Sequence, residues 1–73
     1  MTNEAIVEAA ARLCIKPTRA PVGSHVWECW ADRVQQADMY SRAARGREVG
    51  SDWWNEMIFA CSIAVSEANS SAV

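Results

Sequence analysis

The sequence predicts an all-α protein, a small three-helix domain. Apolar residues recur at helical spacing in three separate segments, and no segment alternates apolar and polar residues as a half-buried strand would. Proline and glycine fall between these segments, at 17–23 and 46–50, where they predict connectors. The 73 residues suffice for one domain, so we expect a single helical domain over residues 1–73.

The first helix is expected over residues 3–15. Thr2 or Asn3 can cap its N-terminus. Glu8 and Arg12 are spaced to pair one turn apart. Pro17 disfavours helical geometry at the residue before it, which places the end of the helix near Ile15. One face carries an apolar stripe of Ile6, Ala9, Ala10 and Leu13.

The second helix is expected over residues 25–45, after a stiff connector at 16–24 that contains Pro17 and Pro21. Ser24 is well placed as its N-cap. Asp38 and Arg42 are spaced to form an ion pair one turn apart. An apolar seam at heptad spacing comprises Trp27, Trp30, Val34, Ala37, Ser41 and Ala44.

The third helix is expected over residues 52–67, and residues 69–73 are expected to fray. Gly46 can end the second helix in the left-handed conformation, and Ser51 or Asp52 can cap the third. The short turn between them predicts an antiparallel hairpin of helices two and three. The main apolar stripe of the third helix comprises Trp54, Met57, Ile58, Cys61, Ala64, Val65 and Ala68.

A second apolar face distinguishes this third helix. Phe59 and Ile63 lie one turn apart, opposite the main stripe. A helix that is apolar on two sides is either central in a core or shared between the core and a partner. We therefore expect the third helix to be the centre of the fold, with Phe59 and Ile63 buried in a two-fold dimer.

Charge and cysteine content narrow the functional classes. The net charge is −2, which argues against a nucleic-acid or anionic-membrane binder. No apolar run approaches the ~20 residues of a membrane span, and we expect no signal peptide. Three cysteines with no close pair make a poor disulfide framework, so we expect buried, reduced thiols and a cytoplasmic location.

We expect the protein to bind neither a metal nor a cofactor, and we expect that it is not an enzyme. His25 and Cys29 lie at i, i+4, and a Cys3His zinc set would need Cys14 and Cys61 from other helices. The chain has no C-x-x-C knuckle, no Gly-rich phosphate loop and no paired-carboxylate signature. A Cys–His nucleophile would also require an orienting group and a cleft, for which a three-helix domain has little room.

The leading functional hypothesis is a small non-enzymatic protein-binding module, an inhibitor or adaptor that is itself a homodimer. Four tryptophans are unusual in so short a chain, and tryptophan is enriched in protein interfaces. Trp27, Trp30 and Trp54 are assigned to the core. Small accessory inhibitors of phage or mobile-element type often have this size. The residues expected at the apolar, acid-rimmed interface are Trp53, Phe59, Ile63, Met39 and Tyr40.

The alternative hypothesis is a small DNA-associated helical regulator. Arg42, Arg45 and Arg47 cluster at the end of the second helix, and Lys16 and Arg19 would join them if the first connector lay nearby. The acidic residues of the third helix, Asp52, Glu56 and Glu67, would repel phosphate, so nucleic acid is the less favoured partner. The residues of this alternative site are Lys16, Arg19, Arg42, Arg45 and Arg47.

Overall fold

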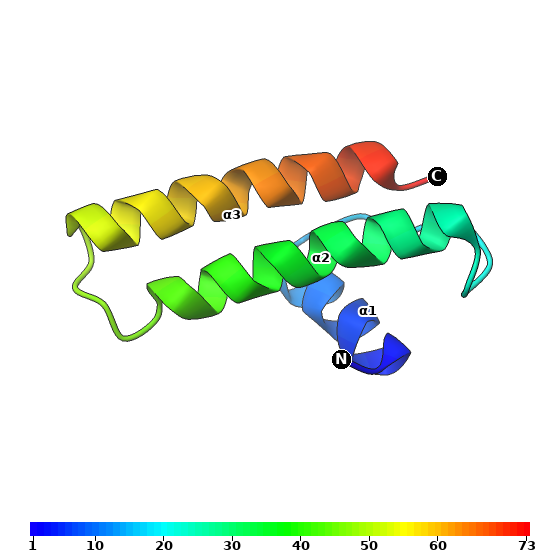
Figure 1. Ribbon diagram of the computed structural model, residues 1–73, viewed down its shortest axis with the longest axis horizontal. Coiled ribbons are helices and arrows are strands. Elements are labelled where there is room, and N and C mark those ends of the chain that lie inside the picture. Colours follow the sequence, from blue (N-terminus) through cyan, green and yellow to red (C-terminus); the bar gives the residue numbers. More distant parts are fainter.

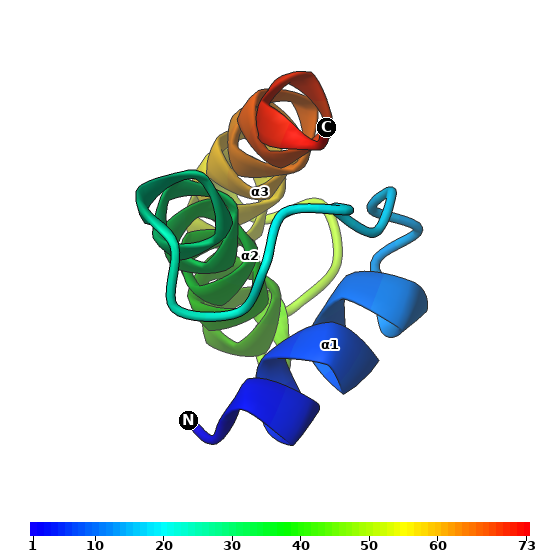
Figure 2. The same cartoon turned by 90° about the vertical axis from the view of Figure 1, so that its right-hand side faces the viewer.

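The computed structural model describes all 73 residues and contains three helices: α1 (Asn3–Arg12), α2 (His25–Ala44) and α3 (Asp52–Ser71). Helices α2 and α3 lie side by side as an antiparallel hairpin, and α1 crosses α2 on the side away from α3 (Figures 1 and 2). The all-α class, the three helices and the hairpin are therefore confirmed.

Helix α2, and not α3, is the centre of the fold. No Cα atom of α1 lies within 8 Å of one in α3, so α2 alone contacts both neighbours. Helix α3 buries only Ala64 and Ala68. The expectation that α3 is central was wrong because its second apolar face lies opposite α2, where no other helix packs. The buried residues of α2 are Trp27, Trp30, Ala31, Val34, Ala37, Asp38 and Ala44.

The helix starts agree with the capping residues in the sequence. The side-chain oxygens of Thr2, Ser24 and Ser51 each accept a hydrogen bond from the backbone N–H three residues on, at 3.1, 3.2 and 3.3 Å. Gly46 and Gly50 both adopt positive φ, at 78° and 88°, in the turn between α2 and α3. That conformation favours glycine, which explains why the hairpin turns there.

Helix α1 ends at Arg12, three residues earlier than expected. Cys14 adopts the left-handed conformation, with φ 59°. The N–H of Ile15 then donates to the Ala10 carbonyl at 2.9 Å, and the N–H of Cys14 to the Ala11 carbonyl at 3.3 Å. These two bonds form a Schellman motif, whose usual left-handed residue is glycine. The motif reverses the chain and places Ile15 in the core.

Helix α3 continues to Ser71, four residues beyond its expected end. Ala68 is fully buried, and the first connector lies against this end of the helix. The N–H of Lys16 donates to Oδ1 of Asn69 at 2.8 Å, and the N–H of Arg19 donates to the Val73 carbonyl at 2.6 Å. The segment expected to fray is therefore helical to Ser71 and hydrogen-bonded to the connector.

A buried carboxylate joins α1 to α2. Asp38 is only 2% exposed and contacts Nη2 of Arg12 at 3.4 Å and Nε of Arg42 at 3.0 Å. The expected Asp38–Arg42 pair is confirmed. Arg12 pairs with Asp38 of the next helix, and it forms no pair with Glu8. A buried charge needs such partners, so Asp38 fixes where α1 crosses α2.

Candidate protein-interaction surface

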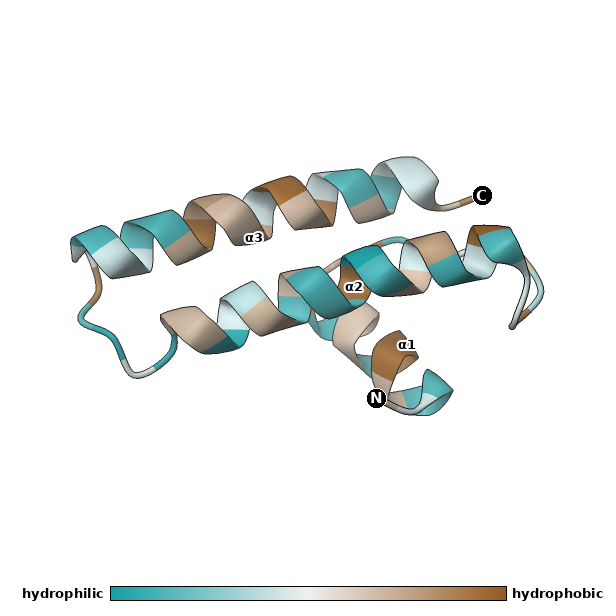
Figure 3. Ribbon diagram, viewed as in Figure 1, coloured by the Kyte–Doolittle hydropathy of each residue, from teal (hydrophilic) through white to brown (hydrophobic).

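The side chains of Phe59 and Ile63 lie on the outer face of α3. Sγ of Cys61 donates to the Ala37 carbonyl at 3.4 Å, so Cys61 faces α2. Residues two apart on a helix are rotated by about 200°, and Phe59 and Ile63 are each two residues from Cys61. They therefore point away from α2, and they are 69% and 45% exposed. Figure 3 shows that hydrophobic residues gather in the middle of α3.

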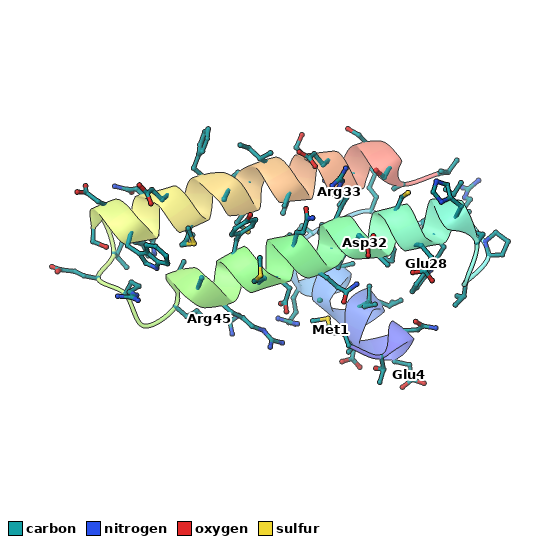
Figure 4. All side chains as sticks on the ribbon, in the orientation of Figure 1. Met1, Glu4, Glu28, Asp32, Arg33 and Arg45 are labelled. Atoms are coloured by element: carbon teal, nitrogen blue, oxygen red, sulfur yellow. The ribbon has the colours of Figure 1, made fainter.

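Ile63 and Tyr40 meet in one groove between α2 and α3. The groove has a volume of about 200 Å³ and is lined by Gln36, Tyr40, Ala60, Ile63, Ala64 and Glu67. Glu67 at its end pairs with Nε of Arg33 at 3.1 Å. Arg33 extends from α2 toward α3 (Figure 4). The groove thus brings together two of the five predicted interface residues, from different helices.

Trp53 and Met39 occupy separate positions. Trp53 lies near the α2–α3 turn, where its indole Nε1 donates to the Ala43 carbonyl at 3.3 Å and the Arg47 guanidinium carbon lies 5.3 Å from its ring centroid. Ala37 contacts α3 and Asp38 contacts α1, so Met39, the next residue along, points toward neither helix. Met39 is 55% exposed and lies apart from Phe59 and Ile63.

A heptad seam runs along the outer face of α3. Its residues follow a 4-3-4-3-4 spacing, which keeps one line of side chains on a helix facing a partner helix. We call this set the outer seam: Asp52, Glu56, Phe59, Ile63, Ser66 and Ser70. All six are exposed. Sequence reasoning found its apolar centre but missed the seam, because the stronger stripe of the same helix dominates the pattern.

The outer seam carries acids in its first half and hydroxyls in its second half. The ion pairs of the chain use Asp38 and Glu67 as their acids, which leaves Asp52 and Glu56 without a basic partner. Ser66 and Ser70 donate no hydrogen bond to a protein group, whereas the neighbouring Ser62 and Ser71 donate to carbonyls of their own helix. The unpaired polar groups are therefore available to a partner.

The basic residues of the DNA hypothesis do not form one cluster. Lys16 lies beside Trp30, whose indole Nε1 donates to its carbonyl at 2.9 Å. Arg42 is twelve residues further along α2, which corresponds to about 18 Å of helix. Arg45 lies at the C-terminal end of α2, on the side away from α3 (Figure 4). Lys16 and Arg19 are thus at one end of the hairpin, and Arg42, Arg45 and Arg47 are at the other.

The cysteines are less buried than expected. Cys14 and Cys29 are exposed and Cys61 is half-buried. The expectation of three buried thiols was wrong because Cys14 lies in the turn after α1 and Cys29 lies on the solvent face of α2. Burial raises the pKa of the Cys61 thiol, and the Asp38 charge raises it further.

The His25–Cys29 pair is formed, with Nε2 and Sγ 3.6 Å apart. No third side chain, whether histidine, cysteine or carboxylate, lies close enough to form a metal-binding group with these two. Cys61, which a Cys3His set would require, instead faces the Ala37 carbonyl across the hairpin.

Comparison with known family models, curated proteins and solved structures finds no match for this chain. None of the helices combines the length and the apolar character needed to cross a bilayer.

Proposed function

We propose that this protein is a small non-enzymatic protein-binding module that acts through the outer seam of α3. The observation that carries the proposal is the exposure of Phe59 and Ile63 on a helix face that no other part of the chain covers. An apolar centre flanked by polar groups is the usual anatomy of a protein interface. Tyr40 and the groove beside Ile63 extend this apolar centre toward α2.

The size of the apolar centre suits reversible binding. Burying a side chain the size of phenylalanine or isoleucine contributes about 1.5–3 kcal/mol. Association costs roughly 4–15 kcal/mol in lost translational and rotational freedom. Phe59 and Ile63 therefore need matching apolar groups on the partner, and the resulting complex is expected to be of micromolar rather than picomolar affinity.

The proposed role is that of an inhibitor or adaptor, which covers or bridges a partner, in the cytoplasm. The acidic half of the outer seam, Asp52 and Glu56, selects against partners of like charge. The same acids disfavour a phosphate backbone. The small size of the chain and its lack of catalytic motifs are typical of phage or mobile-element accessory proteins, which supports this role.

Affinity capture from the native host with matched variants tests the proposal. Phe59→Asp with Ile63→Asp should abolish the capture of a protein that the wild type retains, because two charges replace the apolar centre. Val22→Asp is the control, since it adds an acidic charge to an exposed apolar residue that lies beside α1 and not on α3. If the double variant and the control retain the same proteins as the wild type, the outer seam is not the binding surface.

Salt dependence separates this proposal from the DNA hypothesis. A complex held by Phe59 and Ile63 should persist when salt is raised, because apolar burial does not release counterions. Binding to DNA through the arginines at the end of α2 should instead weaken steeply with salt. A strong, salt-sensitive interaction with duplex DNA would contradict the proposed function.

A further inference from the structure

Resting on the proposed function, we infer that the outer seam also pairs with a second copy of this chain, packed antiparallel so that Phe59 of one copy contacts Ile63 of the other. The inference follows from the order of residues along the seam. Acids occupy its first two positions, apolar residues its middle two and serines its last two. Such a seam is complementary to its own reverse.

The positions of the seam residues along α3 set the antiparallel register. Each seam residue has a counterpart at an equal distance from Cys61 in the opposite direction along α3. Phe59 corresponds to Ile63, Glu56 to Ser66, and Asp52 to Ser70. When two copies of α3 are placed antiparallel about this midpoint, each residue lies level with its counterpart in the other copy. Large side chains then meet at the centre, and acids lie beside serines at both ends.

The polar groups favour this register over the parallel one. In a parallel pair Asp52 and Glu56 would each face the same acid of the second copy, and both lack a basic partner of their own. In the antiparallel pair each carboxylate meets a serine whose hydroxyl donates to no protein group. Hydrogen bonds to a carboxylate are stronger than those between neutral groups. A two-fold antiparallel pair also uses the same face twice, as closed dimers require.

The dimensions of the face match a weak dimer. Helix α3 has 20 residues and is therefore about 30 Å long. A single helix face of that length supplies less than the roughly 800 Å² per partner of a standard interface. The dimer is consequently expected at micromolar concentrations and above, with the monomer predominant when the protein is dilute.

Sedimentation equilibrium from about 1 to 500 µM tests self-association. The wild type and Val22→Asp should shift from monomer to dimer over this range. Phe59→Asp with Ile63→Asp, and the uncharged pair Phe59→Gln with Ile63→Gln, should remain monomeric and retain their helical circular dichroism. A wild type that is monomeric throughout would overturn the dimer.

A gain in affinity tests the register. Ser66→Lys should place a cation beside Glu56 of the second copy and tighten the antiparallel dimer about 3- to 10-fold, as two exposed ion pairs can. In a parallel dimer the same lysines would face each other and weaken it. A gain cannot come from misfolding, so tighter association supports the register directly. Weaker association of a Ser66→Lys variant that retains its helical circular dichroism would overturn the antiparallel register.

Disulfide trapping tests the same register directly. In a background with Cys14, Cys29 and Cys61 replaced by serine or alanine, Asp52→Cys and Ser70→Cys should cross-link when mixed. Asp52→Cys alone should not, because its two copies would be about 27 Å apart. Homodisulfides of Asp52→Cys in place of the mixed species would overturn the register.

The outcomes separate this inference from the proposed function. A wild-type monomer whose capture of a host protein still depends on Phe59 and Ile63 would overturn the dimer and leave the binding surface intact. Self-association and capture that are both insensitive to the double substitution would contradict both.

Discussion

Cys14 is the residue whose conformation least suits its side chain. The left-handed conformation costs a non-glycine residue about 1–2 kcal/mol, and Cys14 holds it at the end of α1. Cys14→Gly should therefore raise the free energy of unfolding by roughly 0.5–1 kcal/mol in urea titrations. Ala11→Gly, one turn earlier in the helix, should lower it by a similar amount. A destabilised Cys14→Gly would mean that the Schellman turn is not formed.

The tryptophans differ in how much each contributes to the core. Trp30 is 1% exposed and donates a hydrogen bond to the Lys16 carbonyl, whereas Trp54 is only half-buried. Trp30→Ala should cost about 3–5 kcal/mol of stability. Trp54→Ala should cost about 1–2 kcal/mol, because less of its surface leaves water on folding. If both substitutions lower the free energy of unfolding equally in chemical denaturation, Trp54 contributes as much to the core as Trp30, which would contradict its half-buried position.

The thiol of Cys61 links stability to alkaline pH. Its pKa lies above 9.0, the ordinary value, because burial and the Asp38 charge disfavour the thiolate. The folded state thus keeps this proton to higher pH than the unfolded state. This contribution to stability is complete below pH 9.0 and is lost as the pH rises through the folded-state pKa. The stability difference between wild type and Cys61→Ala should therefore change above pH 9, to the disadvantage of the wild type. A difference independent of pH would contradict the shift.

At the scale of the elements, α1 depends on one carboxylate. Asp38 is the only buried charged residue, and it holds Arg12 of α1 and Arg42 of its own helix. Hydrogen bonds to charged groups contribute about 1.5–3 kcal/mol each. Asp38→Ala should lower the free energy of unfolding by about 2–3 kcal/mol and increase amide exchange in α1 first. Glu8→Ala, which removes an unpaired acid from α1, should change it by less than about 0.5 kcal/mol. If Asp38→Ala and Glu8→Ala change the free energy of unfolding equally, Asp38 does not hold α1 against α2.

The helix starts were predictable, and two of the ends were not. Ser24 and Ser51 predict where their helices begin, because a side-chain cap is a local signal. The end of α1 was misplaced because Cys14 gives no sign of the left-handed conformation that glycine would have indicated. The length of α3 was underestimated because Asn69 and Ala68 are stabilised by the connector, a contact distant in sequence.

The arrangement of the three helices could not be predicted from the sequence, because it depends on the path of the first connector. That path holds Lys16 against Trp30 and Asn69, at the end of the hairpin remote from Arg42, Arg45 and Arg47. It also leaves α1 on α2, so that one side of α3 has no covering helix. The sequence identified Phe59 and Ile63 as a second apolar face. It did not show whether that face is covered, since this depends on packing and not on periodicity.

The central claim is that the outer seam of α3 is an association surface and not part of the core. The most direct test is the midpoint of thermal unfolding measured against protein concentration, for the wild type and for Phe59→Asp with Ile63→Asp. The wild-type midpoint should rise with concentration, because dimer formation stabilises the folded state by mass action. The double variant should show a constant midpoint that coincides with that of the dilute wild type. A double variant that melts far below the dilute wild type would place Phe59 and Ile63 in the core and contradict the claim.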